Sequence, residues 1–265
     1  MKKYKSEITL IKNNRGCYII DTVKGRGGVN EENPRGCYGD CYANNIASRY
    51  GFDFRNTVNR DFKRDTEQLY LFGFKDQRHE NEIIEMIKKI DMPFVRVGEM
   101  GDPSQDWEHT LNICEIIAQA KKKIVIITKH WKSIPENFLP KLKNLDITIN
   151  TSVSALDDTI DLDYRLGQYN RLKPYCNSVL RIVSCEFNLE NEIGQIRSFI
   201  QEKLFMNENI INTVFRPNIN NPLVTNKIII VKKVKFLKSS VLASCFGDAV
   251  YFGDCKHCPD MCGVK

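Results

Sequence analysis

The stretch KIVIITKHWKSIPENFLPKLKNLDITINTS, residues 123–152, contains the unit from which the fold is built. Residues 123–128 and 147–152 are short runs rich in β-branched and apolar residues, which predicts two strands, and residues 135–145 have the pattern of a helix. Apolar strands that are joined through a helix are typical of a parallel sheet with right-handed crossovers. The stretch therefore predicts an α/β fold.

The same alternation extends over most of the chain. It predicts further strands at 18–23, 93–98, 178–183 and 213–217, and helices at 42–50, 81–90, 107–121, 162–172 and 190–205. A short helix is expected near 66–72, and an added strand or pair of strands at 227–237. Six strand–helix units are too few for an eight-stranded barrel, so we expect a partial (β/α)6 TIM-like barrel. We assign this barrel to residues 1–222 and a C-terminal, cysteine-rich extension to residues 223–265.

Length and composition are those of a globular protein. A chain of 265 residues, 42% hydrophobic and 27% charged, can bury a full core. No apolar run approaches the roughly 20 residues that span a bilayer, and the first residues carry no apolar stretch of the signal-peptide type. We therefore expect a cytoplasmic protein without a membrane partner. The net charge of +6 permits a phosphate-bearing partner but does not require one.

The ten cysteines form two clusters and a set of isolated residues. The first cluster is Cys37 and Cys41. The second cluster, spaced CxxCxxxC, is Cys255, Cys258 and Cys262. Reduced thiols at such spacings usually bind soft metals, either zinc or an iron–sulfur cluster. The isolated cysteines are Cys17, Cys114, Cys176, Cys185 and Cys245. Two of them, Cys114 and Cys185, lie in apolar segments and are predicted to be core thiols.

Polar residues follow the predicted strands at their carboxyl ends, where ligands bind in parallel α/β folds. Besides Cys37 and Cys41 these residues are Gly98, Glu99, Asp102, Lys129, His130, Asn150, Ser152, Ser154, Asp157, Arg181 and Arg216. Structural roles are also open to them: Asp102 can cap the next helix, the two arginines can pair with buried carboxylates, and Lys129-His130 can lie in a surface loop. Their joint position predicts a pocket for a charged ligand.

The order of these motifs resembles the radical S-adenosylmethionine (SAM) superfamily, in a branch near spore photoproduct lyase and related phage proteins. Val97-Gly98-Glu99 resembles the motif that ends the second strand of that family, residues 150–157 look like its fourth-strand segment, and Cys41-Tyr-Ala looks like the start of the helix after its cluster loop. The resemblance covers roughly residues 15–220. The family supplies its cluster ligands as CxxxCxxC, whereas here Asn44 stands at the third position. If Cys41 is aligned with the last cysteine instead, Pro34 and Tyr38 occupy the first two positions.

This resemblance implies a [4Fe–4S] cluster that binds SAM and generates a 5′-deoxyadenosyl radical, which removes a hydrogen from the substrate. It implies that Gly98 and Glu99 hold the SAM amino group. The residues implied to face the SAM ribose or carboxylate are Asn150, Ser152, Ser154 and Arg181. The residues implied to face the substrate are Lys129, His130 and Arg216. The expected partners are a nucleic acid or nucleotide as substrate and an electron donor such as a flavodoxin or ferredoxin.

Three arrangements of the clustered cysteines stay open. The tail and the loop can share one cluster. Alternatively, the tail can carry a cluster by itself, with Cys37 and Cys41 in an auxiliary or redox-active role. In the third arrangement, four of the five cysteines bind a structural zinc ion that joins the C-terminus to the barrel. The alternative function is then a zinc- or cluster-stapled TIM-like barrel that binds nucleic acid, or a non-radical transferase with Asp102 or Asp157 as its nucleophile.

Overall fold

The computed structural model describes residues 7–25, 29, 36–39, 41–49, 51–62, 78–216, 221–225, 227–229, 241–247 and 250–264. Its main feature is a seven-stranded sheet with the order β1-β2-β5-β6-β7-β8-β9. These strands are β1 (Ile11–Lys12), β2 (Tyr18–Ile20), β5 (Phe94–Val97), β6 (Lys123–Thr128), β7 (Ile147–Val153), β8 (Asn177–Ser184) and β9 (Ile210–Val214). Neighbours pair in parallel from β2 to β9, and only β1 is antiparallel. The α/β prediction is confirmed, and the sheet of the described residues is open.

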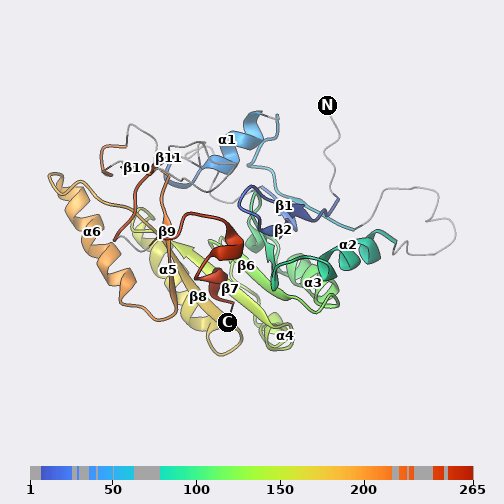
Figure 1. Ribbon diagram of the computed structural model, residues 1–265. Coiled ribbons are helices and arrows are strands. Elements are labelled where there is room, and N and C mark those ends of the chain that lie inside the picture. Colours follow the sequence, from blue (N-terminus) through green and yellow to red (C-terminus); the bar gives the residue numbers. More distant parts are fainter. Residues whose placement is uncertain are drawn as a thin grey trace.

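Helices connect these strands and pack along the sheet (Figure 1). They are α1 (Tyr42–Arg49), α2 (Arg78–Lys88), α3 (Trp107–Ala118), α4 (Leu139–Asn144), α5 (Thr159–Leu172) and α6 (Glu192–Phe205). Asp106, Asp158 and Asn191 begin α3, α5 and α6, because each side chain accepts hydrogen bonds from backbone N–H groups of the first turn. Among the helices that the structure describes, none has the length and apolar character needed to cross a membrane.

The predicted elements are confirmed, with differences at their ends. The strand predicted at 18–23 ends at Ile20, because the chain then turns and pairs β3 (Val23–Lys24) with β4 (Val58–Asn59). The strand predicted at 213–217 begins earlier, and β1 was not predicted at all. The helix expected near 66–72 lies outside the described residues. Of the strand expected at 227–237, only β10 (Lys227–Ile229) is described, paired with β11 (Val241–Ala243).

The two faces of the sheet carry different partners. Because side chains alternate along a strand, neighbouring residues of β7 and β8 point to opposite faces. On one face, Val153, Leu180 and Ile182 form an apolar cluster with residues of α5 and α6. On the opposite face, Ser152 and Arg181 line a cavity. The C-terminal segment, red in Figure 1, crosses β7 on this second face. The cavity and the tail therefore share the face that the helices leave uncovered.

Candidate functional site

A cavity of about 270 Å³ lies at the carboxyl ends of the parallel strands. Its cationic lining residues are Arg15, Arg96, Lys129, Arg181 and Arg216, and its carboxylates are Glu99 and Asp102. Cations therefore outnumber carboxylates around the cavity. Walls of low dielectric constant focus the field of such a set, so the cavity favours an anionic or zwitterionic ligand.

The cavity brings together part of the predicted site. The predicted residues that line it are Cys37, Cys41, Gly98, Glu99, Lys129, Ser152, Arg181 and Arg216. The predicted residues that are not among its described lining are His130, Asn150, Ser154, Cys255, Cys258 and Cys262. The first cysteine cluster thus lies at the same cavity as the motif that follows β5, whereas the cysteines of the tail lie elsewhere on the sheet.

The loop after β5 is held by the strand beside it. Gly98 has φ +89°, a conformation that favours glycine, and its N–H donates to the Ile20 carbonyl at 3.1 Å. The buried Asp21, directly after β2, accepts hydrogen bonds from the N–H groups of Glu99 at 2.7 Å and Met100 at 3.3 Å. Asp21 therefore fixes the backbone that presents Glu99 to the cavity.

Asp102 ties this loop to the end of β6. One of its carboxylate oxygens accepts from the Ser104 hydroxyl at 2.8 Å and the Thr128 hydroxyl at 2.6 Å, and the other accepts from the Lys129 N–H at 2.9 Å. Asp102 also accepts from the Ser104 N–H, so the predicted capping role is confirmed for the short 3-10 turn Pro103–Gln105 rather than for α3. A carboxylate with this many donors is a structural tie between two strands.

Glu99 is already engaged by polar neighbours in the cavity wall. Its carboxylate lies 3.2 Å from the Arg96 guanidinium and accepts a hydrogen bond at 3.2 Å from the Asn13 amide. Arg96 belongs to β5, and Asn13 belongs to the turn between β1 and β2. These contacts keep the carboxylate in place in the wall of the cavity.

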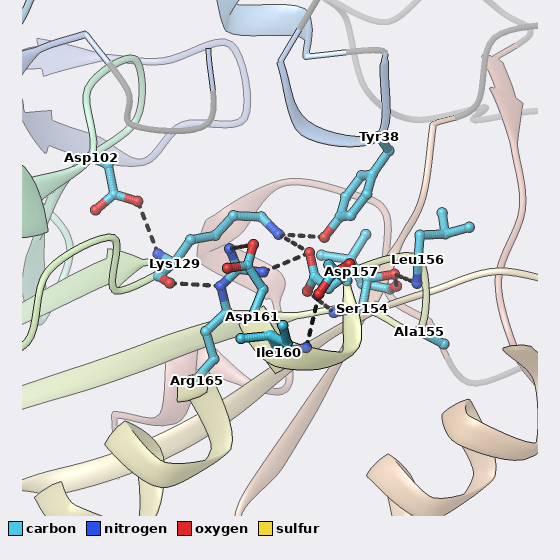
Figure 2. A network of polar contacts seen from close by, with 12 residues as sticks. Tyr38, Asp102, Lys129, Ser154, Ala155, Leu156, Asp157, Ile160, Asp161 and Arg165 are labelled. Atoms are coloured by element: carbon cyan, nitrogen blue, oxygen red, sulfur yellow. Dashed lines mark hydrogen bonds and ion pairs between the residues drawn. The ribbon is translucent and has the colours of Figure 1, made fainter. Parts of the chain in front are cut away.

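Lys129 belongs to a buried network of charges, which Figure 2 shows. Its ammonium group donates to Asp157 at 2.8 Å and to the Tyr38 hydroxyl. Arg165 lies 2.7 Å from the same carboxylate of Asp157 and donates through Nε to the Lys129 carbonyl at 2.8 Å. Despite the burial of the carboxyl group, the nearby Lys129 and Arg165 cations lower the pKa of Asp157. Burial, followed by the charge of Asp157, raises the pKa of Tyr38, which therefore stays a neutral phenol.

Arg181 and Asn150 form a second polar unit on the uncovered face. The Arg181 guanidinium donates to the Asn150 carbonyl oxygen at 3.1 Å and to the Thr213 hydroxyl at 3.1 Å. The Asn150 amide donates in turn to the backbone carbonyl of Cys262 at 2.9 Å. Asn150 therefore connects the cavity residue Arg181 with the tail. Ser154 is part of a turn, since its N–H donates to Asp157 and its hydroxyl to the Val183 carbonyl.

His130 lies on the helix side of the sheet. It is fully buried, its ring is 5.5 Å from the Trp107 ring, and its Nε2 is 3.1 Å from the Thr151 hydroxyl. Burial lowers the pKa of His130 to about 4, so the imidazole is neutral near pH 7. The residue follows Lys129 at the strand end as predicted, but the alternation of side chains turns it away from the cavity.

The tail cysteines meet a cysteine from the other end of the chain. Cys17 and Cys255 are joined by a side-chain hydrogen bond, and this bond lowers the pKa of Cys255 to about 6 while it raises the pKa of Cys17. The charges of Arg15 and Arg96 lower the pKa of Cys255 further. Within the described residues, no three side chains of His, Cys, Asp or Glu are grouped closely enough to hold a metal ion as they stand.

Sequence reasoning missed four residues of this region: Arg15, Asp21, Arg96 and Cys17. Arg96 lies within a strand, and Arg15 and Cys17 lie in or beside a turn, where nothing in a single sequence distinguishes them from surface residues. Asp21 carried a usable signal, because an acidic residue directly after a predicted strand is a candidate for the strand-end site.

Comparisons of this chain with protein-family models, with curated proteins and with solved structures find no match.

Proposed function

We propose that this chain is a radical SAM-type iron–sulfur enzyme built on a partial (β/α)6 barrel and acting in the cytoplasm. One observation carries the proposal. Cys37 and Cys41 line the same cavity as Glu99, at the carboxyl ends of parallel strands. Thiolates suited to iron–sulfur ligation and a carboxylate suited to an amino group are thus available to one ligand.

The cysteines fit a [4Fe–4S] cluster at two of the three positions that the family uses. The third position of the motif is Asn44, which is buried in α1. A cluster held by Cys37 and Cys41 therefore needs one more protein ligand or binds weakly. When bound, the cluster would supply the electron that cleaves SAM to a 5′-deoxyadenosyl radical. The thiols of this site require a reducing compartment, which is why we place the protein in the cytoplasm.

The remaining cavity residues suit the polar groups of SAM. The Glu99 carboxylate would accept hydrogen bonds from the amino group, and the Arg96 contact keeps that carboxylate ionised and in position. Arg181 and Ser152 would bind the carboxylate or the ribose, and Asn150 orients Arg181 from behind. Asn150 and Ser154 thus act in this proposal through the backbone and through Arg181 rather than by contact with the cofactor.

The substrate side of the cavity carries Lys129 and Arg216. Together with Arg15 they favour a phosphate-bearing substrate, so we propose a nucleic acid or nucleotide, with a flavodoxin or ferredoxin as electron donor. His130 has no part in this proposal, because its ring is packed between Trp107 and Thr151. The role of Lys129 would be to hold and orient a phosphate, since its cation is already paired with Asp157.

Anaerobic reconstitution with iron and sulfide tests the proposal. We expect an absorption band near about 400 nm and, with SAM and a reductant, formation of 5′-deoxyadenosine. Cys37→Ala and Cys41→Ala should remove both signals, whereas Cys176→Ala, which lies outside both cysteine clusters, should leave them. Asn44→Cys restores the CxxxCxxC motif and should raise the cluster content per chain. A chain that carries its cluster but yields no 5′-deoxyadenosine would rule out this activity.

A second candidate is a barrel that binds a nucleotide or nucleic acid without radical chemistry. The observations in its favour are Asn44 at the third ligand position and the excess of cations around the cavity. A colourless protein that binds a nucleotide in the cavity but takes up no iron would support this candidate. A transferase with Asp102 or Asp157 as nucleophile has less support, because hydrogen bonds and ion pairs hold both carboxylates.

A further inference from the structure

The C-terminal tail is fastened to the turn between β1 and β2. The Cys255 N–H donates to the Arg15 carbonyl at 2.7 Å, and the Arg15 Nε donates to the Gly253 carbonyl at 2.9 Å. Cys17, the last residue of this turn region before β2, is fully buried, and Cys255 is 8% exposed. The two thiols, 238 positions apart in sequence, share a hydrogen bond. The fold therefore brings an isolated cysteine to the first cysteine of the tail.

The tail backbone also brings its own cysteines together. The Cys258 N–H donates to the Cys255 carbonyl at 3.3 Å, so these residues are the first and last of one tight turn. The next turn is closed by the Met261 N–H, which donates to the Cys258 carbonyl at 3.3 Å. Cys-x-x-Cys turns of this kind are typical of zinc-binding loops.

Cys262 is positioned by the sheet. Its carbonyl accepts from Asn150, and the next residue, Gly263, accepts from the Asn177 amide at 2.8 Å. Cys262 packs against the same apolar cluster that contains Cys17 and Cys255. Its backbone is left-handed, with φ +55°, which is unfavourable for a residue other than glycine and so needs support from its surroundings.

We propose that Cys17, Cys255, Cys258 and Cys262 bind one structural zinc ion that fastens the C-terminal tail to the start of β2. Four protein thiolates complete a tetrahedral zinc site and leave no open position, and none of these cysteines lines the described cavity. Cys17 and Cys255 are already in contact, and metal binding would draw the Cys258 and Cys262 side chains toward that pair. This inference does not depend on the proposed function, which concerns Cys37 and Cys41.

The contact between Cys17 and Cys255 favours zinc over an iron–sulfur cluster. In a tetrahedral site with Zn–S bonds of about 2.3 Å, two sulfur atoms lie about 3.8 Å apart, which is close to the separation of hydrogen-bonded thiols. The thiolates of a four-iron cluster bind different irons and lie farther apart. The nearby Arg15 and Arg96 cations would offset the negative charge of a four-thiolate zinc site.

Metal analysis of the full-length chain, purified anaerobically, tests this site. We expect about one zinc per chain in the unmodified protein and less than about one tenth of that in Cys17→Ser and Cys258→Ser. Cys258 is only half-buried, so its variant keeps the test usable if Cys17→Ser fails to fold. Cys114→Ser is the matched control for Cys17→Ser, since both residues are fully buried, and it should keep its zinc.

A second measurement uses the unmodified protein. A zinc chelator should expose four additional thiols to a thiol reagent. Cys37→Ala should lose the iron of the proposed function and keep the zinc, so the two proposals can fail separately. The zinc site is overturned by a chain without zinc, by tail variants that lose iron instead of zinc, or by a Cys17–Cys255 disulfide in protein purified under reducing conditions.

Discussion

Asp157→Asn should destabilise the fold, because one buried carboxylate serves two buried cations. Asp157 is 6% exposed and lies 2.8 Å from the Lys129 ammonium and 2.7 Å from the Arg165 guanidinium. Arg165 keeps a second carboxylate, the half-exposed Asp161, whereas Asp157 is the carboxylate that Lys129 contacts in the described residues. Breaking a buried pair by removing one partner costs about 3–5 kcal/mol. Asparagine still accepts one hydrogen bond, so we expect a loss of about 3 kcal/mol.

Denaturant unfolding near pH 7 measures this loss. The corresponding fall in the melting temperature is about 6–12 °C for a chain of this size. Glu136→Gln is the control, because Glu136 pairs with Arg171 at the surface with its side chain 81% exposed, and its loss should stay below about 1 kcal/mol. Adding Lys129→Met to Asp157→Asn should restore part of the stability, since it removes one unpaired cation. If Asp157→Asn unfolds within about 1 kcal/mol of the unmodified protein, the network does not carry the weight argued here.

Three further predictions concern other parts of the molecule. Because burial holds the pKa of His130 near 4, the unfolded chain takes up a proton between about pH 6.5 and 4 that the folded chain does not. The free energy of unfolding should therefore fall by about 3 kcal/mol over this range, and His130→Asn should remove that slope from unfolding curves measured against pH. Gly101→Ala should lower the free energy of unfolding by at least about 2 kcal/mol, because a Cβ there would lie 1.6 Å from the Val23 carbonyl; Gly167→Ala, in an open helical position, should raise it by about 0.5–1 kcal/mol, and the opposite ranking would contradict the packing. Glu99→Gln should weaken SAM binding about 10–100-fold by calorimetry, and unchanged affinity would remove Glu99 from the proposed site.

The sequence predicted the parallel part of the fold well because the strands are buried on both faces. The strand predicted at 123–128 and β6 have the same bounds, since a run of β-branched residues between a lysine-rich turn and a polar loop leaves little choice of register. β1 was missed because it has only two residues and both are exposed. Its partner β2 was predicted too long, because the polar Asp21 and Thr22 were read as part of the strand instead of its end.

The site was predicted only in part, and the reason is the direction of side chains. Strand ends identify which residues are near the cavity, but not which of two neighbours faces it. Lys129 and His130 illustrate this: one lines the cavity, and the other lies beneath the helices. Asn150 and Arg181 were both assigned to the cofactor, and only Arg181 lines the cavity, with Asn150 beside it as its hydrogen-bond partner. Long-range contacts such as Cys17 with Cys255 leave no local trace in the sequence.

Arg15 links the cavity to the tail, and this link gives the C-terminal segment a consequence beyond its own stability. The Arg15 residue lines the cavity, while its Nε and its carbonyl are both bonded to residues 253–255. The same turn carries Asn13, which donates to Glu99, and Cys17, which contacts Cys255. A tail that is released from the sheet would therefore remove the partners of Arg15 and loosen the turn that supports Glu99. The integrity of the cavity, and not only that of the C-terminus, depends on how firmly the tail is fastened.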